Sequence, residues 1–253
     1  MIILLRILPL LVALLQVGVF LSQLNNPQNY PWIVLTGVLA LPIASFFIIW
    51  KRVGFKHMVE KMTPSFILLV ALAFALLLVE SRVAQTAVVA IAAVSSFVSL
   101  ELLFLLAFNP SKYPVNALSR LNIAYVPIAV WYIAYTLNGL QTFLHMGRVW
   151  PAVGMTLLGA ILFRTTGHPE ATRQQNILWT GVGALVGAHV GLLGIIMPIS
   201  MPMQGIIAAL LLSGALRVRR YVHNPKPSRK QSWIEGIVAL AAFAALLGTA
   251  KWL

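Results

Sequence analysis

Two ionisable side chains lie deep inside long apolar stretches, where they could take part in chemistry. Glu101 is the only acidic residue well inside such a stretch, and His189 is the only histidine inside one. Because a polar group is costly to keep in a bilayer, such residues are the first candidates for a functional site. Glu101 could hold a proton or a cation. Alternatively, its carboxylate could snorkel toward the inner surface, or pair with Arg120, Arg164 or a hydroxyl on a neighbouring helix.

His189 could act as a proton relay or a base, or it could be a hydrogen-bonded residue of a packing helix. Gly183, Gly187 and Gly191 recur around it at intervals of four and form a stripe that allows close helix approach. His189 is expected on a different face from that stripe. Glu101 and His189 are expected about 6 Å and about 4 Å from the midplane on opposite sides, so direct contact would need a shifted helix.

The segment 188–194, with His189, Gly191 and Gly194, resembles the histidine-bearing helix of rhomboid intramembrane serine proteases. That family also carries a Gly-x-Ser-Gly nucleophile signature. Here Leu212-Ser213-Gly214 lacks the first glycine and follows the histidine instead of preceding it. The sequence therefore does not place the chain in that family.

A second polar group is expected on the fifth apolar stretch. Asn122, Tyr125, Tyr132 and Tyr135 fall within an arc of about 140° at 100° per residue. Pro127 interrupts the helical hydrogen bonds beside them. This face could border a cavity for a substrate or a lipid headgroup, or it could be a packing face whose phenols bond to neighbouring helices.

Cations gather in two loops. The loop 164–173 carries two arginines that could bind phosphate, although a solvated connector is the simpler interpretation. The segment 217–230 is expected to contact anionic lipid headgroups or a membrane-protein partner. Its six cations are Arg217, Arg219, Arg220, Lys226, Arg229 and Lys230.

Several chemistries are excluded by composition and motifs. The chain has no cysteine, which removes disulfides, thiolate metal ligands and iron–sulfur clusters. It has no Walker A or HExxH motif, and its five acidic residues are too scattered for a multi-carboxylate metal site. We therefore expect no metal and no cofactor. Nucleic-acid binding is disfavoured as well, because the cations follow the loops of a membrane protein.

Composition points to an all-α, multi-pass membrane protein. Hydrophobic residues make up 60% of the chain and charged residues 9%, against about 25% charged in soluble domains. Long uncharged runs approach the roughly 17–25 residues needed to cross a bilayer. We expect one transmembrane domain and no soluble domain, with Thr63-Pro64 beginning the third helix and a capping box at Ser232 and Glu235 beginning the ninth. The nine expected helices cover 4–22, 31–50, 64–80, 86–108, 121–140, 149–163, 176–197, 203–218 and 233–252.

Charge gives the orientation. With the N-terminus inside and the C-terminus outside, 15 of the 18 Lys and Arg residues fall on the inner side. A bacterial or archaeal cytoplasmic membrane is the expected location. The scarcity of ionisable groups in the spans favours a non-catalytic scaffold or subunit of a membrane complex. The alternatives are a small transporter for a small molecule, ion or lipid with Glu101 and His189 near its pathway, and, third, an intramembrane enzyme.

Overall fold

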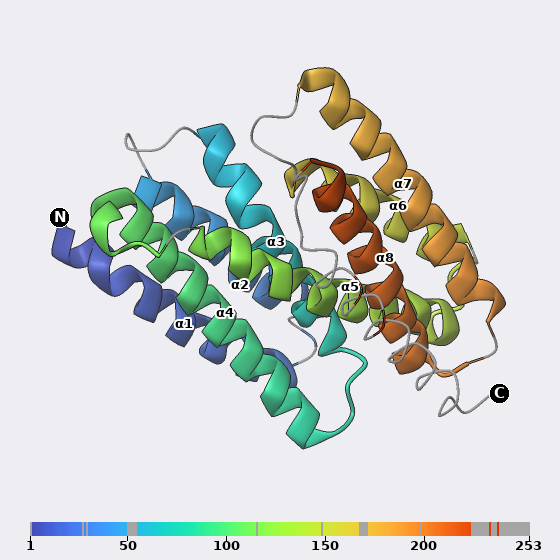
Figure 1. The fold of residues 1–253 in the computed structure, drawn as a ribbon. Coiled ribbons are helices and arrows are strands. Elements are labelled where there is room, and N and C mark those ends of the chain that lie inside the picture. The colour runs from blue at the N-terminus through green and yellow to red at the C-terminus, as the bar shows by residue number, and fades with distance from the viewer. Residues whose placement is uncertain are drawn as a thin grey trace. The chain divides into compact units, whose positions relative to one another are not determined.

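Helices joined by loops make up the part of the chain that the structure describes. The computed structural model describes residues 2–26, 28, 30–49, 55–114, 116–147, 149–166, 172–197, 199–223, 233 and 237. No strand occurs among these residues (Figure 1). The elements are α1 (Ile2–Asn25), α2 (Tyr30–Ile49), α3 (Phe55–Ala75), α4 (Arg82–Phe108), the 3₁₀ turn η2 (Pro110–Lys112), α5 (Ala117–Phe143), α6 (Val149–Thr165), α7 (Arg173–Ile196) and α8 (Met201–His223).

Seven of the described helices are long and apolar enough to cross a membrane, and α6 is a shorter apolar helix of 17 residues. The chain therefore has the helices of a multi-pass membrane protein. The stretch 176–218 forms two helices, as predicted, with a break between Ile196 and Met201. The expected ninth helix at 233–252, with its capping box, lies outside the described residues.

The third helix was predicted to begin at Pro64, and this is wrong. It begins at Phe55 and ends at Ala75, with Pro64 inside it. The Thr63 hydroxyl does not cap a helix, because it donates to the Val59 carbonyl one turn earlier at 2.6 Å. A proline inside a helix leaves the preceding turn short of hydrogen bonds. Pro64 lacks the N–H that would bond the Glu60 carbonyl. A side chain from α5 bonds the next carbonyl, because Asn122 Nδ2 donates to the Lys61 carbonyl at 2.9 Å.

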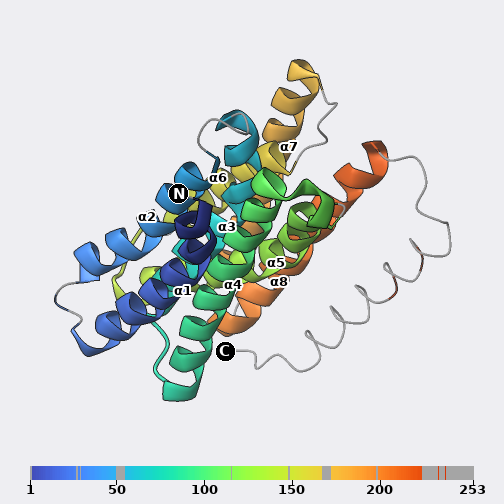
Figure 2. The ribbon, with the colours of Figure 1, turned by 90° about the vertical axis from the view of Figure 1, so that its left-hand side faces the viewer.

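Residues 1–125 form one compact unit. In it α1 packs against α4 and α2, and α2 packs against α3 and α4. Figures 1 and 2 show α1 running alongside α4. Apolar side chains from α1, α3 and α4 fill its interior, and Phe20, Leu68, Leu72 and Leu100 are fully buried. Burial of such side chains against each other, rather than against lipid, gives the close contacts that hold transmembrane helices together.

Residues 126–253 form the second compact unit, in which α6 and α7 make the most extensive helix pair. Three glycines of α7 lie against α6. A Cβ at Gly187 would clash with the Met155 carbonyl, and one at Gly191 would lie 2.6 Å from the Ala152 Cα. A Cβ at Gly183 would meet Gly159 and the side chain of Phe163. The missing side chains therefore let the two backbones approach to contact distance.

This contact yields a first prediction. Gly187→Ala should lower the free energy of unfolding in detergent by about 1–3 kcal/mol, because the added methyl group overpacks the α6–α7 contact. Gly181 is the matched control on the same helix, since nothing lies within 4 Å of a Cβ there. Gly181→Ala should be neutral, or stabilising by up to about 1 kcal/mol. Equal losses from both variants would contradict the packing described.

Candidate functional site

Glu101 is ion-paired with Arg6. An Arg6 Nη1 atom of α1 lies 2.6 Å from a Glu101 Oε1 atom of α4. The guanidinium also covers the Phe104 ring at 5.1 Å from its centroid. Pairing was one of the alternatives expected from sequence, with Arg120, Arg164 or a hydroxyl as the partner; Arg6 was not among them.

The pair lies near one end of both helices. Arg6 is in the first two turns of α1 and Glu101 in the last two turns of α4. The Arg6 side chain is 52% exposed and that of Glu101 is 23% exposed, so the carboxylate is the more enclosed group. An arginine with a long apolar stem can reach the membrane surface from such a position. The Glu101 carboxylate thus has a positive partner already in place.

Hydroxyl and amide groups connect α3, α4 and α5 in the same unit. The Ser65 and Ser99 hydroxyls are 2.9 Å apart, and the Tyr125 hydroxyl donates to the Ser95 carbonyl at 3.2 Å. As described above, Asn122 Nδ2 donates to the Lys61 carbonyl of α3. The side chains of Ser65, Ser99 and Tyr125 are buried. These groups of helix five therefore bond to neighbouring helices, which was one of the two expectations for that face.

Two glutamines of α1 also form hydrogen bonds to neighbouring helices, and neither was predicted as a candidate. The Gln16 amide donates to the Gly37 carbonyl of α2 at 2.7 Å, and the Gln23 amide donates to the Ala73 carbonyl of α3 at 3.0 Å. At Ala73 the helix is ending, because the Leu77 N–H donates to Phe74 instead. Gln23 thus satisfies a carbonyl that the helix end leaves open. Their spacing of seven, which places both on one helix face, was the available signal.

His189 lies on the exposed side of α7, away from the glycines that contact α6. Its Nδ1 atom is 2.7 Å from the Leu185 carbonyl oxygen of the preceding turn. Glu101 and His189 are thus each engaged locally, one with Arg6 and the other with its own helix. Neither arrangement provides the paired acid and base of a dyad.

The remaining tyrosines of helix five lie in the second unit. Tyr132 is buried and its ring lies 4.7 Å from that of Trp131, while Tyr135 is half-buried. Further along α5, the buried Asn138 borders a void of about 10 Å³ with Gly194 and Gln204. That space holds about one water molecule. It is too small for a substrate.

Arg219 is buried, although it was expected to face headgroups with its neighbours. Its side chain is 3% exposed and its guanidinium lies 5.5 Å from the Trp179 ring centroid and 5.9 Å from that of Phe163. Nη2 donates to Asn176 Oδ1 at 3.4 Å. Aromatic faces attract a cation, which explains why α6 and α7 enclose it. Arg217 is exposed. The side chain of Arg220, and Lys226, Arg229 and Lys230, lie outside the described residues.

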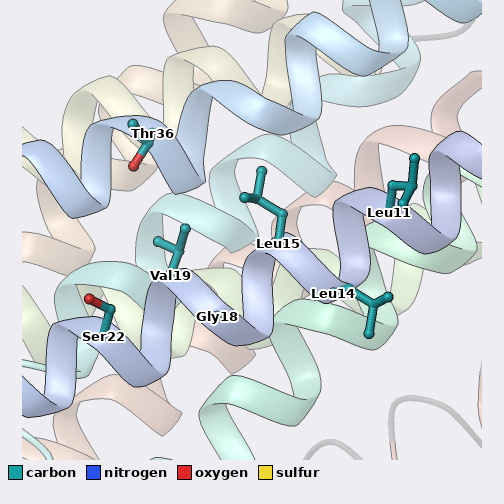
Figure 3. Close-up of a pocket in the computed structure, with 7 residues that line it drawn as sticks. All are labelled: Leu11, Leu14, Leu15, Gly18, Val19, Ser22 and Thr36. Carbon is teal, nitrogen blue, oxygen red and sulfur yellow. The ribbon is translucent and has the colours of Figure 1, made fainter.

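An open groove of about 620 Å³ runs between α1 and α2 (Figure 3). Figure 3 shows Leu15 and Val19 of α1 directed toward α2, and Thr36 of α2 directed toward α1. Leu11, Leu14, Gly18 and Ser22 complete its lining. The Thr36 hydroxyl bonds to the Trp32 carbonyl of its own helix. Neither this groove nor the void beside Asn138 is lined by Glu101 or His189.

The ion pair yields a second prediction, tested by a double-mutant cycle. Arg6→Gln and Glu101→Gln should each destabilise the protein, and the double variant should lose less than the two losses added together. The expected coupling is about 0.5–1 kcal/mol, because the pair is partly exposed. Unfolding in mixed detergent measures it. The exposed Arg82 is the control, and Arg82→Gln should change stability by less than about 0.5 kcal/mol. Strict additivity would show that the pair contributes nothing.

The chain was compared with known proteins at three levels. Protein-family models, curated proteins and solved structures contain no match to this chain.

Proposed function

We propose that the protein is a non-catalytic scaffold or subunit of a membrane complex. One observation carries the proposal: several polar side chains in the apolar helices bond to a neighbouring helix or within their own helix, although the buried hydroxyls of Ser96, Thr136 and Ser213 have no hydrogen-bond partner among the described residues. Gln16, Gln23, Asn122 and Tyr125 each donate to a carbonyl of a neighbouring helix. Groups committed in this way stabilise a bundle and are not available to bind a substrate.

The state of Glu101 supports the same proposal. A carboxylate that carries protons across a membrane must bind and release a proton, so an ion pair with an arginine has to open during each cycle. Glu101 instead lies within 2.6 Å of Arg6, which also covers the neighbouring Phe104 ring. Transport remains the alternative. It would require this pair to open and a path to form past Glu101 and His189.

The proposed topology has the N-terminus inside and the C-terminus outside a bacterial or archaeal cytoplasmic membrane. In this orientation Arg6, Arg164, Arg173 and Arg217 share the inner side, where anionic headgroups attract cations. All four are exposed. We infer that they contact lipid headgroups, whereas Arg219 holds α6, α7 and α8 together.

Proteoliposomes give the third prediction. Wild-type protein should dissipate an imposed pH gradient no faster than empty liposomes do, and Glu101→Gln should not change the rate. A flux above that of empty liposomes that is lost in Glu101→Gln would show a transporter and would overturn the scaffold proposal.

The scaffold proposal also has a positive test, which gives the fourth prediction. Native mass spectrometry after extraction in mild detergent should show the chain bound to another membrane protein in fixed stoichiometry. Repeating the extraction in a harsh detergent, which separates most membrane complexes, is the control. A chain recovered only as a monomer with lipid in the mild detergent would count against a scaffold or subunit.

A further inference from the structure

Helix α7 carries two opposite faces of different character. Gly183, Gly187 and Gly191 contact α6, as described above. The opposite face is exposed along its whole length and falls within an arc of about 80° at 100° per residue. We call it the outer stripe; its residues are Leu178, Gly181, Leu185, His189, Leu192 and Ile196.

Most of the outer stripe suits lipid, but His189 does not. Leu185 is 63% exposed, Leu192 49% and Ile196 73%. His189 lies among them, about 10 Å from the end of the helix at 1.5 Å per residue. A polar atom that faces hydrocarbon without a partner costs several kcal/mol in general. The stripe therefore needs an occupant that can form a hydrogen bond at this depth.

The hydrogen bond within α7 determines what that occupant must offer. A carbonyl oxygen only accepts, so the 2.7 Å contact with Leu185 requires the proton on Nδ1 of His189. In the neutral ring Nε2 is then a bare acceptor. None of the described residues donates to it. The occupant must therefore bring a donor, such as a hydroxyl, an amide NH₂ or an indole N–H.

We propose that the outer stripe docks a transmembrane helix of a different protein, which carries such a donor opposite His189. Lipid chains have no donor. In a parallel pair of two copies of this chain, the two His189 rings would meet as acceptor against acceptor. Gly181 would allow the partner helix to approach closely, since its surroundings are open. This inference rests on the proposed scaffold function and names the surface it uses.

Site-specific photocross-linking tests the proposal and gives the fifth prediction. A benzophenone amino acid placed at Leu185 or Leu192 should yield one discrete adduct with another protein in the native membrane. The cross-linked peptide, sequenced by mass spectrometry, should be an apolar helix with Ser, Thr, Tyr, Asn, Gln or Trp near the cross-link. Leu157 of α6 is the control position, since it is 59% exposed and lies off the stripe, and it should not yield this adduct.

Variants at His189 separate the hydrogen bond from simple apolar contact. His189→Leu should lower the adduct yield by roughly three- to fifteen-fold, the range expected for one hydrogen bond between membrane helices. His189→Gln keeps an acceptor and should retain most of the yield. An unchanged yield in His189→Leu would overturn the proposal. So would a cross-link to a second copy, a cross-link to residues 224–253 of the same chain, or no protein adduct. The liposome flux reports on the scaffold function separately from these outcomes.

Discussion

The absence of water inside a bilayer is the constraint on which the described structure depends. A soluble helix can leave a glutamine or serine to the solvent, but a membrane helix must give it a protein partner. The amide nitrogens of Gln16 and Gln23 donate to carbonyls of α2 and α3, and the Ser65 and Ser99 hydroxyls bond to each other, whereas the buried Ser96 hydroxyl has no partner among the described residues. The bonded polar residues of the first unit thus join neighbouring helices, while its leucines fill the space between them.

The second unit reaches close packing by another route. Its α6–α7 pair depends on missing side chains, so that backbone touches backbone at Gly159, Gly183 and Gly187. Arg219 is enclosed at one end by the aromatic rings of Phe163 and Trp179. Through these contacts the Arg219 side chain of α8 connects α6, α7 and α8. Both units therefore use their unusual residues for assembly, which is why a scaffold is the function they support best.

Hydropathy predicts membrane helices well but does not predict their contacts. The limits of α2 and α6 were predicted within two residues, because each apolar run is bounded by polar or turn-forming residues. The start of α3 was missed, since a threonine–proline pair at a helix start and one inside a helix look alike in sequence. The Arg6–Glu101 pair joins residues 95 positions apart. No local pattern encodes such a pair, and the burial of Arg219 likewise depends on helices that meet only in the fold.

The central claim is that the buried polar groups of the first unit face protein and not a water-filled path. Because the chain has no cysteine, single cysteines can test this without background. Ser95 and Ser99 are buried in α4, and Ser111 is exposed in η2. A small, water-soluble, charged maleimide should label Ser111→Cys when it is given access to both sides of the membrane, and it should not label Ser95→Cys or Ser99→Cys in the folded protein. Rapid labelling of either buried position, at a rate near that of Ser111→Cys, would show an aqueous path and contradict the account.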